Sequence, residues 1–453
     1  MREKKLHIGF LTTEYIIPPN KLAGGLATYI QRVAYELIDQ NHSVSVFCLS
    51  NRDNTWVDNG VDVYEVNIKR NFPYIRMSNF FPPLKQLENL FIGSKRLAKF
   101  VWIVHKIKPL DIIQASSYKS VGLTLCNNAK IPIVTRISSI SIFWRNKEGQ
   151  ENSISSALID WAEIYQIEQS DGVFSPSELM SRYFSLFSII KPKVIRTPFP
   201  TLPFNLDTSI YDNFLSGKKY LLFFGQISRK KGIEVISKII PKIISDFPDI
   251  YFVFVGYSLN YSDDETFIDR LLLENHLYKN NIIAIEILDK KKLFPIIQKA
   301  YAVLIPSLID NYPNTCLEAQ HQGKIIIGTK DSSLEEMIMD GKTGFLVENN
   351  DSLSLEKGIR NLLNLSNEDY HTMEENVNNR FMKDASEDRV DSLLTYYSKI
   401  ISEFPKNKSF SKINLEKLLL LDKLRINFWI GLLPKKLLYV LRKTINICRN
   451  KFI

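Results

Sequence analysis

Short apolar segments alternate with amphipathic helical segments along most of the chain. Apolar runs predict strands in the first half at His7–Leu11, Ser43–Leu49, Val61–Val66, Asp111–Gln114, Pro132–Arg136 and Gly172–Ser175. Helical spacing of apolar residues predicts helices at Leu26–Gln40, Leu84–Lys106 and Asp160–Gln169. This alternation of strands with helices predicts parallel βαβ units.

The second half repeats the alternation after a proline-rich segment. Pro192, Pro198, Pro200 and Pro203 cannot continue a helix or a strand, so we expect the linker between two domains there. Later strands are predicted at Tyr220–Phe224, Tyr251–Val255, Ile282–Ile285, Ala302–Ile305 and Lys324–Ile327. A chain of 453 residues exceeds the size of one core. We therefore expect α/β domains at residues 1–200 and 201–385.

The segment Ala302–Val347 carries the most specific chemistry. It predicts a strand, a loop ending in Asp310, a helix beginning near Asn314, a second strand, a second helix and a hairpin-like return. The free N–H groups at the start of such a helix bind anions such as a diphosphate. Seven residues separate Asp310 from Glu318, and carboxylates in these places accept hydrogen bonds from hydroxyl groups. The pattern indicates a nucleoside diphosphate that carries a sugar.

This segment resembles the signature of retaining GT-B glycosyltransferases of family 4, in which seven residues separate two glutamates. Leu221–Gly232 is similar to the family's strand followed by Gly-Arg and Lys-Gly, and Ala23–Ala27 to its Gly-Gly loop. The resemblance covers residues 5 to about 400. It implies a GT-B fold, in which two Rossmann-like domains face each other across a cleft. It also implies that a final helix, at about residues 386–403, crosses back to the first domain.

The resemblance also implies roles for single residues. Asp310, in place of the family's glutamate, would contact the donor sugar, and Glu318 the ribose. Lys231 would stabilise the departing diphosphate, unless it belongs with its basic neighbours to a solvated cluster. The further donor-binding candidates are Gly24, Gly25, Ser138, Gln226, Arg229, Asn314, Thr315 and Glu336. Glu336 is equally well read as a charge on a helix surface, and the two glycines as a tight turn.

Two positions depart from the family pattern. Gln226 replaces an arginine, so either Arg229 reaches into the site or the site has one cation fewer. Ser138 replaces a histidine, and serine cannot carry a proton near neutral pH. In the family, retention is ascribed to front-side attack assisted by the leaving phosphate. The missing histidine is therefore expected to change sugar recognition more than the chemistry.

Charge and composition limit the partners. Twelve Lys or Arg and only two acidic residues lie between Phe404 and Ile453, so the net charge of +9 belongs to this tail and not to a nucleic-acid-binding domain. Leucines beside these cations predict an interfacial helix on an anionic membrane, or a helix pair that binds a partner. The aromatic and basic loop Asn71–Pro83 is a second candidate for acceptor or lipid contact.

Four separated cysteines and six scattered histidines give no metal-binding spacing, so no metal or other cofactor is expected. No uncharged apolar stretch is long enough to span a bilayer. These features predict a cytoplasmic protein attached to the inner face of a membrane.

The sequence thus predicts a retaining glycosyltransferase that uses a UDP- or GDP-linked sugar. Its predicted acceptor is a glycan, lipid-linked as in the assembly of bacterial surface polysaccharides or lipopolysaccharide. A sugar-nucleotide epimerase of the same fold and a non-catalytic scaffold that binds nucleotide stay open as alternatives. A dinucleotide-binding dehydrogenase is disfavoured because no GxGxxG follows the first strand.

Overall fold

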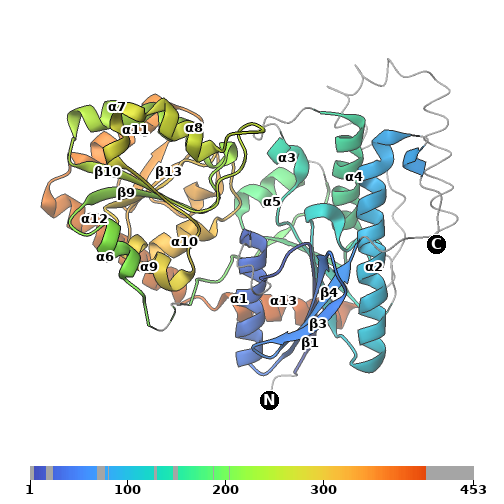
Figure 1. The fold of residues 1–453 in the computed structure, drawn as a ribbon. Coiled ribbons are helices and arrows are strands. Elements are labelled where there is room, and N and C mark those ends of the chain that lie inside the picture. The colour runs from blue at the N-terminus through green and yellow to red at the C-terminus, as the bar shows by residue number, and fades with distance from the viewer. Residues whose placement is uncertain are drawn as a thin grey trace.

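Two parallel sheets, each covered by helices, form two lobes that lie side by side (Figure 1). The computed structural model describes residues 5–16, 24–68, 77–79, 81–126, 130–145, 152–186, 188–201, 203 and 205–404. The two-domain α/β architecture expected from the sequence is confirmed. The predicted basic tail lies outside the described residues, except for Phe404, as does most of the aromatic loop before Pro83.

The first lobe contains an eight-stranded sheet in which only the edge strand β3 runs antiparallel to its neighbour. In spatial order its strands are β3 (Asn54–Asp58), β4 (Val61–Asn67), β2 (Ser43–Ser50), β1 (His7–Thr12), β5 (Ile112–Ser116), β6 (Ile133–Arg136), β7 (Gly172–Ser175) and β8 (Lys193–Val194). Its helices are α1 (Gly25–Asp39), α2 (Lys85–Ile107), α3 (Ser141–Arg145), α4 (Ile154–Gln169) and α5 (Glu178–Ser185).

The second lobe contains a six-stranded, wholly parallel sheet. In spatial order its strands are β11 (Ile282–Ile285), β10 (Ile250–Val255), β9 (Lys219–Phe224), β12 (Ala302–Ile305), β13 (Ile326–Thr329) and β14 (Gly344–Val347). Its helices are α6 (Ser209–Phe214), α7 (Ile233–Asp246), α8 (Phe267–Glu274), α9 (Lys290–Lys299), α10 (Asn314–His321), α11 (Ser352–Leu363) and α12 (Asn367–Ala385). Apolar residues fill both faces of this sheet, which explains the continuous apolar run at β9.

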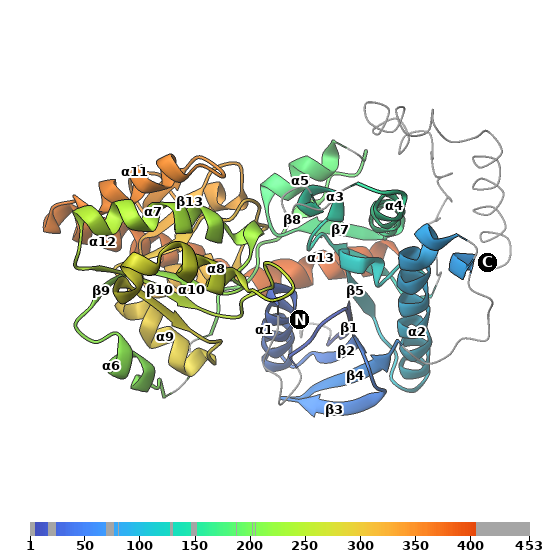
Figure 2. The same ribbon diagram turned by 45° about the horizontal axis from the view of Figure 1, so that its top comes forward.

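The last described helix, α13 (Arg389–Glu403), packs on the first lobe although it follows the second in sequence (Figure 2). Buried Tyr397 donates a hydrogen bond to the Gln114 side chain at 2.5 Å. The Tyr396 hydroxyl bonds both backbone groups of Val173 in β7, at 2.9 and 3.1 Å. The two tyrosines therefore hold the end of the second lobe's chain on the first sheet.

One expected element is wrong. The return after β13 is not hairpin-like, because β14 runs parallel to β13 and pairs Ile326 with Gly344. The intervening residues form only a short 3-10 helix (Ser333–Glu336) and a loop that crosses over, and Gly344 has a φ of 158°. A side chain there would lie 2.1 Å from the carbonyl oxygen of Ile326, so the close strand pairing requires glycine.

Among the helices that the structure describes, none is both long and apolar enough to cross a membrane.

We predict that Glu36 makes stability depend on pH. Burial, the largest effect, raises the pKa of this α1 carboxyl to about 7, against attraction by Arg32. An acid whose pKa is raised by folding stabilises the fold below its unfolded pKa, and loses this contribution as pH rises through the folded pKa. Glu36→Gln should therefore raise the free energy of unfolding at pH 8, relative to pH 4.5, by about 2 kcal/mol.

Urea unfolding at both pH values measures this difference, and the exposed Glu375→Gln is the matched control. An equal pH dependence of Glu36→Gln and the wild type would contradict the prediction.

Candidate functional site

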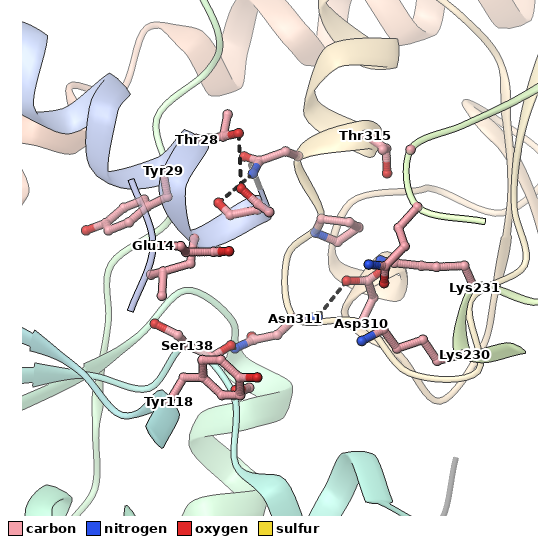
Figure 3. Close-up of a pocket in the computed structure, with 18 of the residues that line it drawn as sticks. Glu14, Thr28, Tyr29, Tyr118, Ser138, Lys230, Lys231, Asp310, Asn311 and Thr315 are labelled. Carbon is pink, nitrogen blue, oxygen red and sulfur yellow. Dashed lines mark hydrogen bonds and ion pairs between the residues drawn. The ribbon is translucent and has the colours of Figure 1, made fainter. Parts of the chain in front are cut away.

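A cavity of about 1330 Å³ lies between the lobes (Figure 3). Much of its lining comes from loops that follow the carboxyl ends of strands in both sheets, where open α/β sheets bind ligands, and the rest from adjoining helices. The cavity brings together most of the residues named from the sequence: Gly24, Gly25, Ser138, Gln226, Lys231, Asp310, Asn314, Thr315 and Glu318.

Lys231 is placed by a tight turn after β9. It ends a 3-10 turn (Arg229–Lys231), and Gly232, with a φ of 79°, then begins α7. A Cβ on Gly232 would lie 2.0 Å from the Pro306 carbonyl oxygen, so only glycine lets this turn approach the loop after β12. The Leu308 N–H donates to the Lys230 carbonyl at 2.8 Å, which ties the two loops together.

This approach lets Lys231 form an ion pair with Asp310, from Nζ to Oδ2 at 2.5 Å. The Asp310 side chain is only 8% exposed, and its other oxygen accepts the Asn311 N–H at 3.1 Å. Charge-assisted bonds of this kind are short and strong. Lys231 therefore faces the cavity in a fixed position and not as part of a solvated cluster.

The predicted helix α10 begins at Asn314, as expected. Pro313 precedes it and supplies no side-chain cap, and both Asn314 and Thr315 line the cavity. The first N–H groups of the helix therefore keep their capacity to bind an anion. Lys230 and Lys231 line the same side of the cavity, which makes this side favourable for a diphosphate.

Glu318 lies one turn into α10 and is buried. Burial, the largest effect, raises the pKa of its carboxyl, while the charges of Lys290 and Arg32 act in the opposite direction. The same burial lowers the pKa of the Lys290 ammonium, which Glu318 partly offsets. This carboxylate in the cavity wall can accept hydrogen bonds from ribose hydroxyl groups, the role that the resemblance implies.

Ser138 reaches the cavity from the first lobe. Its Oγ accepts hydrogen bonds from Arg136 at 3.0 Å and from Ser116 at 3.2 Å. Arg136 is itself buried and lies over the Tyr29 ring, with 3.8 Å between the guanidinium carbon and the ring centroid. Ser138 is thus a fixed polar group where the family has a histidine.

Asn311 joins the two lobes beside Asp310. Its amide nitrogen donates to the carbonyls of Ile137 at 3.0 Å and Ser138 at 3.1 Å, and its oxygen accepts from the Ser177 hydroxyl at 2.7 Å. Asn314 adds a bond to the Gly25 carbonyl at 3.0 Å. The second lobe's signature loop therefore contacts the first lobe directly.

Two predicted donor-binding residues are not among the lining residues. Arg229 forms an ion pair with Glu234 at 3.1 Å and does not line the cavity. The part of the cavity wall near Gln226 therefore has no arginine from this turn. Glu336 instead accepts the backbone N–H groups of Glu178 and Leu179 at 3.0 and 2.8 Å. It caps α5 of the first lobe, because a carboxylate is favourable at a helix N-terminus. In this arrangement its carboxylate is therefore used between the lobes, not on a nucleotide.

Several polar residues of the cavity wall were not assigned to the site from the sequence, among them Glu14, Lys230, Lys290 and Asn311. Glu14 follows β1 by two residues, and its position just beyond a strand end is a usable signal. Lys290 carried no such signal, since it is one of three consecutive lysines.

The described residues contain no group of three or more His, Cys, Asp and Glu side chains that could hold a metal ion.

Residues 23–199 match the family model described as Glycosyltransferase Family 4, and residues 211–380 match the one described as Glycosyl transferases group 1. The chain belongs to the retaining GT-B glycosyltransferases of family 4. Of the functional classes that the sequence left open, membership of this family supports a glycosyltransferase enzyme.

Similar proteins agree with the family. The phosphatidylinositol N-acetylglucosaminyltransferase GPI3 subunit of Saccharomyces cerevisiae (strain YJM789) is 20% identical over 331 residues, 71% of this chain and 68% of that protein. Sucrose-phosphate synthase from Thermosynechococcus elongatus has a TM-score of 0.70 at 17% identity, over 88% of this chain and 100% of that one. Anabaena Alr3699/HepE in complex with UDP-glucose has a TM-score of 0.63 at 16% identity, with the same coverage. The structural likeness confirms the GT-B fold.

We predict that Asn311→Ala uncouples the lobes of this family 4 enzyme. The change removes three hydrogen bonds across the interface and should weaken the coupling by about 2–3 kcal/mol. In calorimetry, the thermal transition of Asn311→Ala should be broader than that of the wild type, or split into two.

Asn281→Ala is the control, because its two bonds stay within the second lobe. A calorimetric profile of Asn311→Ala that differs from the wild type no more than this control does would contradict the prediction.

Proposed function

We propose that the enzyme transfers a sugar, with retention of configuration, from a UDP- or GDP-linked donor to a glycan acceptor. The observation that carries this proposal is the fixed Lys231–Asp310 pair beside the start of α10, with Glu318 one turn further on. In this arrangement the lysine and the free helix N–H groups would bind the diphosphate. The two carboxylates would bind hydroxyl groups, Asp310 those of the donor sugar and Glu318 those of the ribose.

Cations in the cavity wall and likeness to a protein solved with a nucleotide sugar support the proposed donor. Lys231, Lys230 and the α10 terminus would share the negative charge of the diphosphate, and Asp310 would hold donor sugar hydroxyls while keeping its pair with Lys231. The Anabaena HepE structure was solved in complex with UDP-glucose, which favours a uridine nucleotide as the first donor to test.

The proposed reaction needs no proton carrier at Ser138. The bond from the anomeric carbon to the diphosphate oxygen breaks, and a bond forms to the acceptor oxygen on the same face. The hydroxyl proton passes to the departing phosphate oxygen. Lys231 stabilises the charge that develops on that phosphate. We propose that no metal ion takes part.

The acceptor is proposed to be attached to a membrane. The cations and leucines between Phe404 and Ile453 would hold the enzyme on the anionic cytoplasmic face of a membrane. The GPI3 relative is named for transfer to phosphatidylinositol, a lipid. We therefore propose a lipid-linked glycan acceptor, as in the synthesis of bacterial surface polysaccharide.

We predict that Lys231→Ala lowers kcat by about 10²–10³-fold, because it removes the cation that stabilises the leaving group. Glu318→Ala should instead abolish the thermal shift caused by the matching nucleotide. Thermal shift and turnover with UDP-glucose, UDP-N-acetylglucosamine and GDP-mannose measure both effects.

Lys299→Ala, an exposed change on α9, is the control. A folded wild-type protein that neither binds nor turns over any of these donors would sink the proposed function.

We also predict that replacing Lys435, Lys436, Arg442 and Lys443 by Gln weakens binding to anionic vesicles. Each cation near such a surface contributes about 1 kcal/mol, so the loss should exceed a hundredfold at low salt. Co-sedimentation with phosphatidylglycerol vesicles measures it, with phosphatidylcholine vesicles as the control. Equal binding of variant and wild type would exclude electrostatic anchoring by these residues.

A further inference from the structure

Charged groups from both lobes line the cavity. On the second lobe, Lys230, Lys231 and Lys290 line the cavity with the start of α10. On the first lobe, the lining includes the Glu14 carboxylate and the hydroxyl groups of Ser138 and Ser139, together with the buried guanidinium groups of Arg136 and Arg145. Figure 3 shows Glu14 and Ser138 across the cavity from Asp310 and the two adjacent lysines. A phosphate is attracted to the lysines and repelled by the Glu14 carboxylate at its own place in the wall.

Glu14 differs from Asp310 in having no cationic partner within the described part of the chain. Asp310 is paired with Lys231, whereas no described residue forms an ion pair with Glu14. The Glu14 Oε1 accepts one long hydrogen bond, from the Ala27 N–H in the first turn of α1 at 3.4 Å, and its Oε2 accepts none from the described residues. Glu14 is therefore a carboxylate in the cavity wall with unused capacity to accept hydrogen bonds.

Gly24 makes room for this carboxylate. A Cβ on Gly24 would lie 2.6 Å from Glu14 Oε1 and 2.9 Å from Oε2. The Gly24 backbone has a φ of −74° and a ψ of 178°, which any residue adopts. Space, not backbone conformation, is what glycine provides here. The N-terminus of α1, which follows Gly24, is in this structure next to an anion.

A purely structural role for Glu14 would be to cap the N-terminus of α1. Capping explains the hydrogen bond that Oε1 accepts, because α1 has no other side-chain cap. Capping explains neither Oε2, to which no described residue donates a hydrogen bond, nor the position of the carboxylate in the wall of the cavity.

We propose that Glu14 accepts a hydrogen bond from a hydroxyl group of the acceptor and selects an acceptor that is uncharged around this hydroxyl. This inference rests on the proposed function, since it concerns the second substrate of the same cavity. A neutral sugar or polyol can donate to Glu14, whereas a phosphate beside the reacting hydroxyl is repelled. The Glu14 charge thus disfavours the donor's diphosphate at this place in the cavity wall.

Glu14→Gln tests the proposal, because glutamine keeps an oxygen for the Ala27 N–H and removes the charge. The donor is UDP-glucose, and the acceptor probes are octyl glucoside and a phosphorylated octyl glucoside. We expect kcat/KM for the neutral probe to fall about tenfold or more, as for the loss of a hydrogen bond to a charged group. The preference for the neutral over the phosphorylated probe should shrink, while UDP affinity by calorimetry and the melting temperature stay at wild-type values.

Gly24→Ala is an independent test that leaves the carboxylate chemically intact. The added methyl displaces the flexible end of Glu14, so its effect on acceptor kcat/KM should match that of Glu14→Gln. The double variant should lose little more than either single one, because both changes act through the same group.

Glu335→Gln, an exposed carboxamide change outside the cavity, is the matched control. An unchanged preference between the two probes in Glu14→Gln would overturn the proposal, as would a parallel loss of UDP affinity. Failure of the proposed function would instead be seen in the wild type, as an absence of transfer and of UDP binding.

Discussion

The contact of Asn311 with the first lobe is the constraint on which the site depends. Three hydrogen bonds fix this side chain between Ser177 and the carbonyls that follow β6. Its neighbour Tyr312 holds a φ of 59°, and the Ser333 hydroxyl bridges the Tyr312 N–H and the Asp310 carbonyl. A left-handed tyrosine costs energy unless its surroundings enforce it. The loop is therefore rigid, and Asp310 has a defined position relative to both lobes.

Burial and charge then divide the tasks of the carboxylates in the cavity. Asp310 is neutralised by Lys231, and the pKa of Glu318 is raised mainly by burial, with Lys290 and Arg32 opposing the rise. Glu14 has neither kind of cationic support from the described residues. Three carboxylates of similar chemistry therefore face a ligand in three electrostatic environments. We propose that this difference allows one cavity to hold an anionic diphosphate and a neutral sugar side by side.

The sequence predicted the elements that local patterns specify. Continuous apolar runs located the central strands, and the Asp310–Glu318 spacing located the start of α10 at Asn314. It failed where the outcome depends on distant partners. The parallel β14 needs a crossover that no local pattern encodes, because its pairing with β13 rests on Gly344 meeting the Ile326 carbonyl. Glu336 was left open between a nucleotide contact and a helix-surface charge, because the α5 N–H groups that it binds lie over 150 residues earlier.

By itself, the sequence determined the α/β class, the family and which residues of the second lobe are candidates for binding a diphosphate. These follow from residues close together in the chain, whose spacing on one strand, loop and helix fixes their geometry. The tertiary structure alone decided which cations face the cavity, why Gly24 is glycine and how Asn311 joins the lobes. Each of these depends on atoms from separate elements meeting within a few ångströms, a proximity that the folded sheets create and that sequence spacing does not record.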